Sequence, residues 1–240
     1  RYVLFTTIAF LLFYILWKNK RAFNKIQQRS ASKKDFWREM CNSLLNGFVF
    51  ALMGYLLLQT PLRDITKIYT DVHVHGSAWL FLSVVVMLLL HDTYFYWMHL
   101  IVHHKAIFRF VHLVHHKSTN PSPFAAYSFH ILETIVESVV IFILPFLIPL
   151  HPVSLMLFST IALAINIYGH LGYEVMPQWF RHSFLFQIIN TSVYHNLHHS
   201  KFKGNYGLYF RIWDRLLGTE HPDYVRNYDK IQQRRFGQTE

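Results

Sequence analysis

Eight of the seventeen histidines in the chain fall into three short clusters with helical spacing. Because an α-helix repeats every 3.6 residues, residues three or four positions apart project from one face. Neutral imidazoles bind iron, zinc, copper and nickel, so each cluster can offer several ligands to a metal ion. One HxxxH pair and two HxxHH clusters contain these histidines: His99 and His103; His112, His115 and His116; His195, His198 and His199.

His170, in the segment "GHLGYE", is a ninth candidate ligand. Eight or nine imidazoles are too many for one ion, but they suit two ions with four or five ligands each. A single HxxHH cluster could be a surface feature. Two HxxHH clusters and one HxxxH pair in one chain indicate a shared site, and we predict a histidine-rich di-metal site.

The composition predicts that lipid surrounds much of the chain. Hydrophobic residues make up 52% and aromatic residues 18%, whereas charged residues make up 15% and lie between long apolar runs. The net charge of +10 could suggest nucleic acid. Because the basic residues flank apolar runs, we instead expect anionic lipid headgroups and no nucleic acid. We predict an all-α integral membrane protein, multi-pass in the bilayer.

Four apolar stretches predict about four transmembrane helices. They are residues 2–17, 44–58, 78–98 and a longer stretch, 135–168. Pro145, Pro149 and Pro152 interrupt the last of these, so we expect a helical hairpin there, which could also dip into the bilayer and return.

Charge then predicts the topology. Residues 18–38 are rich in Lys and Arg, which indicates a cytoplasmic loop. The second span then runs from the cytoplasmic face to the outer face, the third runs back to the cytoplasmic face, and the hairpin crosses to the outer face and returns. Residues 99–130 and 170–219 therefore meet on the cytoplasmic face, where we expect a helical cap that holds the metals. We treat residues 1–240 as one domain and, since the first residue is Arg1 rather than Met, expect a fragment or processed form.

The order of these motifs between apolar spans resembles the fatty acid hydroxylase and sterol desaturase superfamily. "HDTYFYWMH", "GHLGYE" and the tail "HHSKFKGNYGLYFRIWDRLLGT" add to the resemblance, which covers residues 91–219. It implies an integral membrane oxygenase with a non-haem di-iron centre held by the nine histidines. Such an enzyme uses O2 to hydroxylate or desaturate a C–H bond of a sterol, sphingoid base or fatty acyl lipid, its membrane lipid substrate.

Two acidic residues are predicted to support the ligands from a second layer. Asp92 lies on the same face of its helix as His99 and His103, where its carboxylate could accept the spare ring N–H of a ligating histidine. Glu174 stands where fatty acid 2-hydroxylases have a second histidine, which favours the sterol oxidase and sphinganine hydroxylase branches. His130 and Glu133, in "FHILE", could line the substrate access route or form a local polar pair.

Electrons are expected from an external donor. The chain contains no GxGxxG or CxxCH motif, and its single cysteine, Cys41, excludes a four-cysteine iron–sulfur cluster. A cytochrome b5, ferredoxin or reductase type of donor is therefore expected on the basic cytoplasmic face.

Two other function classes remain open from the residues alone. A zinc-dependent membrane hydrolase would normally show HExxH or fewer histidine ligands with an open water position. A non-enzymatic metal or haem carrier would place its ligands within the membrane spans. Zinc could also occupy an iron site by mismetallation, because neutral imidazoles bind it tightly.

Overall fold

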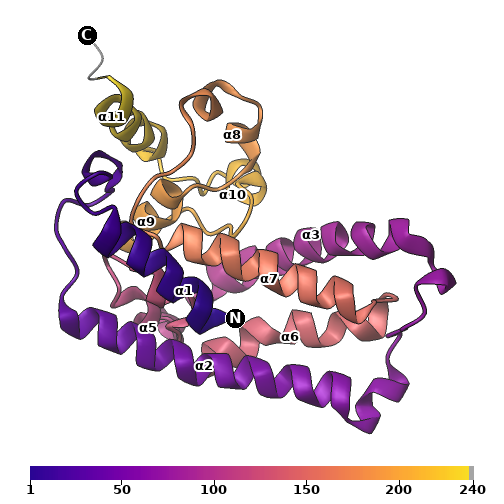
Figure 1. Cartoon of the computed structure of the whole chain (residues 1–240). Coiled ribbons are helices and arrows are strands. Elements are labelled where there is room, and N and C mark those ends of the chain that lie inside the picture. The colour runs from indigo at the N-terminus through magenta and orange to yellow at the C-terminus, as the bar shows by residue number, and fades with distance from the viewer. Residues whose placement is uncertain (238–240) are drawn as a thin grey trace.

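The computed structural model describes residues 1–237, and its regular elements there are all helical. Three helices are long and apolar enough to cross a membrane: α2 (Lys33–Gln59), α3 (Gly76–Val102) and α7 (Pro152–Gly169). Together with α6 (Ile131–Leu147), they run alongside one another as an elongated bundle (Figure 1). The prediction of an all-α membrane protein is confirmed.

Apolar side chains on the outside of this bundle agree with a lipid environment. Phe48 on α2 is 66% exposed and Phe81 on α3 is 64% exposed. A soluble helix would turn such residues toward the core, because water penalises exposed apolar area. The inner faces form a separate core in which Val84 and Met87 of α3 meet Phe158 of α7.

The first apolar stretch forms a shorter helix than the other three. It consists of α1 (Tyr2–Phe10) followed by a π-helical segment, η1 (Leu11–Leu16). The basic segment behind it contains one short 3₁₀ turn, η2 (Ala22–Asn24). Its last residues already belong to α2, which begins at a capping box formed by Ser32 and Asp35. Hydropathy located the apolar part of α2 but not its polar first turns.

The predicted hairpin break lies at residues 148–151. Pro152 is the first residue of α7, where its missing N–H costs no hydrogen bond, and Pro145 is accommodated near the end of α6. This turn lies beside the α2–α3 connection, which contains η3 (Pro61–Ile65) and η4 (Val72–Val74): the backbone N–H of Tyr69 donates a hydrogen bond to the carbonyl of Leu150. The connections at this end therefore meet far from the histidine clusters.

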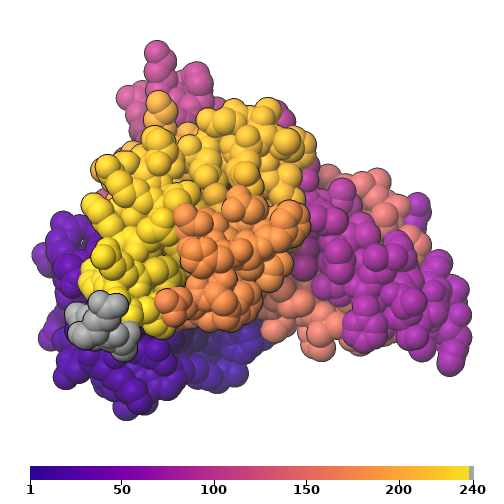
Figure 2. Space-filling view, turned by 90° about the horizontal axis from the view of Figure 1, so that it is seen from above, coloured from indigo at the N-terminus to yellow at the C-terminus, as the bar shows by residue number. Residues whose placement is uncertain are grey.

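The opposite end of the bundle carries a helical cap. It consists of these elements: η6 (Gln178–His182), α8 (Leu185–Ile188), α9 (Ser192–Lys201), α10 (Ile212–Leu216) and α11 (Tyr224–Phe236). Its core gathers Phe186, Tyr194, Tyr224 and Tyr228. Seen from above, the cap covers one end of the bundle and leaves the rest of α3 projecting beyond it (Figure 2).

Between α3 and α6 the chain stays near the cap. This segment contains α4 (Lys105–Val111), α5 (Leu113–His116) and a 3₁₀ turn, η5 (Pro123–Tyr127), which packs against α2. It carries the second histidine cluster. The fold thus brings together segments of the chain that are about a hundred residues apart.

Candidate metal centre

All nine predicted histidines lie at the capped end of the bundle. They come from the C-terminal turn of α3, the α4–α5 segment, the residue that ends α7, and α9. Within the described residues they form two groups. Inside each group, every residue has a ring nitrogen within 4.8 Å of a ring nitrogen of each other member. The first group has five members and the second has four: His99, His103, His112, His116 and His198; His115, His170, His195 and His199.

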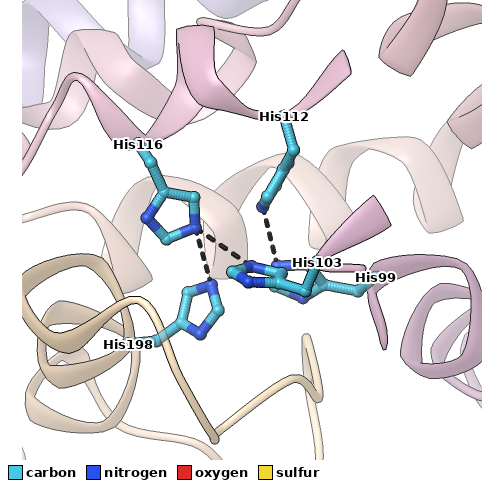
Figure 3. A group of neighbouring side chains, drawn as sticks. All are labelled: His99, His103, His112, His116 and His198. Carbon is cyan, nitrogen blue, oxygen red and sulfur yellow. Dashed lines mark hydrogen bonds between the residues drawn. The ribbon is translucent and has the colours of Figure 1, made fainter. Parts of the chain in front are cut away.

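The five-histidine group converges through its Nε2 atoms (Figure 3). The Nε2 of His116 lies 3.1 Å from that of His103 and 3.1 Å from that of His198. The Nε2 atoms of His99 and His112 are also 3.1 Å apart. Three separate chain segments therefore point their ring nitrogens at one small volume.

The four-histidine group has the same character. The Nε2 of His195 lies 3.0 Å from that of His170 and 3.1 Å from that of His199. His115 approaches His170 with an Nε2–Nε2 distance of 3.4 Å. The two groups adjoin, because the rings of His116 and His199 stack with their centroids 5.0 Å apart.

Hydrogen bonds on the far side of the rings fix which nitrogen faces inward. The Nδ1–H groups of His99, His170 and His198 donate to the backbone carbonyls of Tyr206, Asn166 and Gly204, at 2.8, 2.8 and 2.7 Å. A carbonyl can only accept, so each of these neutral rings has its proton on Nδ1 and a lone pair on Nε2. Each inward Nε2 atom therefore presents a lone pair of the kind that can bind a metal ion.

The donor set fits metal ions better than hydrogen bonds between rings. Lone pairs of neutral rings that face one another repel unless a cation lies between them. Nitrogen ligands of one ion, each at about 2.0–2.1 Å, are separated by about 2.9 Å at right angles and about 3.4 Å at tetrahedral angles. The observed Nε2–Nε2 distances of 3.0 to 3.4 Å lie within that interval.

Burial keeps these rings neutral. It lowers the pKa of His170 and of His198 to about 4 from the usual value near 6.5. Burial first, and then the neighbouring imidazoles, also lower the pKa of the other candidates outside α3: His103, His112, His115, His116, His195 and His199. Neutral imidazole is the form that binds a metal, so the environment favours ligation at neutral pH.

Glu133 is a supporting residue whose contact the sequence did not reveal. Its Oε1 accepts a hydrogen bond of 2.6 Å from the Nδ1 of His112. A carboxylate in this position orients a ligating ring and increases the basicity of its inner nitrogen. The signal was present in the sequence as an acidic residue in the apolar helix α6. The predicted pairing with His130 is not seen, because His130 caps α6 through the N–H of Leu132 instead.

Asp92 supports the site in a different way from the one we predicted. Its Oδ1 accepts the backbone N–H groups of Leu208, Tyr209 and Phe210 rather than a ring N–H of a histidine. The prediction that Asp92 contacts the ring of a ligating histidine is therefore wrong, because the backbone N–H groups of a loop in the cap occupy its carboxylate instead. By holding this loop, Asp92 helps to place the Tyr206 carbonyl against His99.

Glu174 anchors the helix that carries the last cluster. Its carboxylate accepts hydrogen bonds from the hydroxyl of Tyr168 and from the backbone N–H groups of Met176 and Val193. Val193 lies in the first turn of α9, where N–H groups have no partner within the helix. Glu174 thus touches no histidine ring, but it fixes the start of the helix that contains His195, His198 and His199.

The histidines outside the two groups make local contacts or lie elsewhere in the fold. His104 is exposed and accepts the N–H of Ala106 at the start of α4, although it is adjacent to His103. His91 is buried on α3, with its Nδ1 3.0 Å from the hydroxyl oxygen of Tyr209. His73 and His75 lie at the opposite end of the bundle.

A cavity of about 720 Å³ occupies the bundle between α1, α2, α6 and α7. Apolar side chains make most of its wall, and none of the nine histidines lines it. Its polar lining includes Glu137, Asn166 and Tyr209. Asn166 is the residue whose carbonyl holds His170, so the cavity reaches the immediate neighbourhood of the histidine groups.

A comparison with known families decides the relationship. Residues 84–219 match the model of the fatty acid hydroxylase family, and this segment contains all nine histidines. The chain belongs to this family. The relationship agrees with the resemblance seen in the motifs.

Individual proteins similar to this chain include several sterol enzymes. The chain is 35% identical to lathosterol oxidase of Rattus norvegicus over 69% of its own length and 55% of the relative's. It is 32% identical to a Delta(7)-sterol 5(6)-desaturase of Gibberella zeae, over 77% and 57% of the two chains. It is 33% identical to the cholesterol 25-hydroxylase-like protein of Danio rerio, over 82% and 77%.

The chain spans a little over half the length of the lathosterol oxidase from rat. No solved structure matches it.

Proposed function

We propose that the protein is an O2-dependent lipid oxidoreductase, a hydroxylase or desaturase, that holds two iron ions in the two histidine groups. The observation that carries this proposal is the position of five and four converging histidines next to a largely apolar cavity. Relatives named as sterol oxidases, desaturases and hydroxylases favour a sterol among the candidate lipids.

The residues of the chain have distinct tasks in this proposal. The nine histidines would hold the iron, and bound iron would supply the redox chemistry that lets O2 attack an unactivated C–H bond. Glu133 and the carbonyls of Tyr206, Asn166 and Gly204 fix the ring orientations. The cavity would hold the lipid, since its volume lies in the range of roughly 300–1,000 Å³ that is typical of ligand sites.

The positive charge near the histidine clusters favours an external electron donor with an acidic surface. The two segments that carry most of the histidines, residues 93–132 and 175–213, contain no Asp or Glu. Their exposed cations are Lys105, Arg109, Lys117, Lys201 and Lys203. A cytochrome b5, ferredoxin or reductase with an acidic face would be attracted to this end, which we assign to the cytoplasm.

A zinc hydrolase is less favoured than an oxidoreductase. Catalytic zinc is usually held by three protein ligands and keeps an open position for water. Here one group supplies four imidazoles and the other supplies five. Zinc in a purified sample would therefore be read as mismetallation unless hydrolysis were shown directly.

The test is a turnover experiment with iron-loaded protein, lathosterol, a reductant system and 18O2. A product with one 18O atom would show hydroxylation, and a product that has lost two hydrogens without gaining 18O would show desaturation. His103→Ala should abolish the product, whereas the matched control His104→Ala should keep most of it. Oxidation that persists after iron removal, or that is lost equally in both variants, would contradict the proposal.

A further inference from the structure

Glu137 is a carboxylic acid with an unusual position in the wall of the cavity. It lies on α6, is 5% exposed, and its Oε2 has no hydrogen-bond partner among residues 1–237. Glu137 is one of the residues that line the cavity. A buried polar group without a partner destabilises the fold, so such a group in the wall of a ligand cavity indicates a partner supplied by the ligand.

Asn166 offers a second acceptor to the same cavity. Its Nδ2 donates a hydrogen bond of 2.7 Å to the carbonyl of Ala126, which fixes the orientation of the amide. The Oδ1 of Asn166 is buried and has no partner among the described residues. The wall of the cavity therefore contains two buried acceptors without a partner, one from α6 and one from α7, and a donor from the ligand would satisfy them.

Both acceptors lie one helical turn from residues that support the metal site. Glu137 follows Glu133, the partner of His112, by four residues, which is ~6 Å along a helix. Asn166 precedes His170 by four residues and accepts from its ring through the backbone carbonyl. The acceptors thus belong to the part of the cavity next to the histidines.

We propose that Glu137 and Asn166 form a subsite that binds the hydroxyl group of a neutral lipid alcohol. This inference rests on the proposed function and names the group by which the substrate is recognised. A hydroxyl can donate to either acceptor, whereas a fatty acid carboxylate has no proton to donate at neutral pH and would leave the Oδ1 of Asn166 without a partner. The subsite therefore selects a sterol-type alcohol over a free fatty acid.

The position of the subsite also predicts which carbon reacts. A hydroxyl bound there lies about one turn from the residues that support the ligands, so the carbons presented to the metals are those near the hydroxyl. The far end of an alkyl tail would extend toward Val3 and Met156, which line the same cavity and are exposed at the surface.

The subsite can be tested by binding, without turnover. Tritiated lathosterol is bound to the purified chain in detergent and displaced by unlabelled lathosterol, by its 3-O-methyl ether or by palmitate. The ether keeps the shape of the sterol but cannot donate. Wild type should prefer lathosterol to the ether by about tenfold, the factor that corresponds to one buried acceptor left without a donor.

Two variants of Glu137 and one matched control separate the subsite from general packing. Glu137→Leu should reduce the preference to about twofold or less and raise the unfolding midpoint of the sterol-free protein by about 2–4 °C, because an unpartnered polar group is removed. Glu137→Gln keeps an acceptor and should retain part of the preference. Glu39→Gln changes a buried carboxylate outside the cavity, which accepts from Ser122, and should leave the preference intact.

The outcomes distinguish the subsite from the proposed function. An unchanged preference in Glu137→Leu, or equal binding of lathosterol and ether by wild type, would overturn the subsite and leave a sterol substrate standing. Wild type that binds neither sterol but binds palmitate would overturn the sterol substrate and the subsite together.

Discussion

The carboxylate of Glu133 lies 2.6 Å from the Nδ1 of His112, and both side chains are buried. This contact joins the apolar helix α6 to the five-histidine group. Among the described residues, it is the one carboxylate that touches a ring of either group. It makes Glu133 the strongest test of how the protein prepares a ligand for metal binding.

Replacing Glu133 by Gln should weaken metal binding by about 10- to 100-fold, because the amide no longer increases the basicity of the His112 ring. The measurement is competition with a chelator of known affinity. Glu39→Gln is the control, since it alters another buried carboxylate that touches no histidine. Equal affinity in wild type and Glu133→Gln would show that the contact is only structural.

Asp92→Asn should lower the stability of the fold clearly and the affinity for metal only slightly. The carboxylate accepts three backbone N–H groups of the 208–210 loop, and hydrogen bonds to a charged group contribute about 1.5–3 kcal/mol. We expect a lower unfolding midpoint in detergent and a smaller loss of metal affinity than in Glu133→Gln. The reverse order would indicate a direct role for Asp92 at the metals.

Gly204→Ala should disturb the five-histidine group through its backbone. Gly204 has a φ of +76°, and a Cβ there would lie 2.8 Å from the carbonyl oxygen of Thr219. Gly218 has a φ of +67° and open space around it, so Gly218→Ala pays only the backbone cost of about 1–2 kcal/mol. Gly204→Ala should lower both the unfolding midpoint and the metal content further, because the Gly204 carbonyl holds His198. Similar effects of the two substitutions would refute this role.

The metal-free protein should lose stability in acid. The pKa of His170 and of His198 is about 4 in the folded state, whereas an unfolded histidine titrates near 6.5. Between these values the unfolded chain binds more protons, so the stability is complete above about pH 6.5 and falls as the pH drops toward 4. Unfolding midpoints at pH 7.5, 6 and 5 test this, and an unchanged or rising midpoint would contradict it.

The regular spacing of the histidines made the site visible in the sequence. His112, His115 and His116 are neighbours on one helical turn whatever the rest of the fold does. Hydropathy and the position of Pro149 likewise predicted the apolar helices and the break between α6 and α7. These features depend on local periodicity, which a single sequence records.

The partners of the rings could not be predicted, because they come from distant segments. His99 contacts the Tyr206 carbonyl, more than a hundred residues away. The division into five and four histidines depends on how α9 packs against α5, and the partner of Asp92 depends on a loop in the cap. The predicted partner of Asp92 was a histidine ring, whereas its observed partners are the backbone N–H groups of that loop.

The central claim is that each histidine group binds its own metal ion. Metal analysis of protein purified anaerobically in mild detergent tests it, with one variant for each group. We predict about two ions per chain in wild type, about one in His198→Ala and about one in His115→Ala, and almost none when both are replaced. One ion per well-folded wild-type chain, removed equally by either substitution, would contradict a di-metal centre.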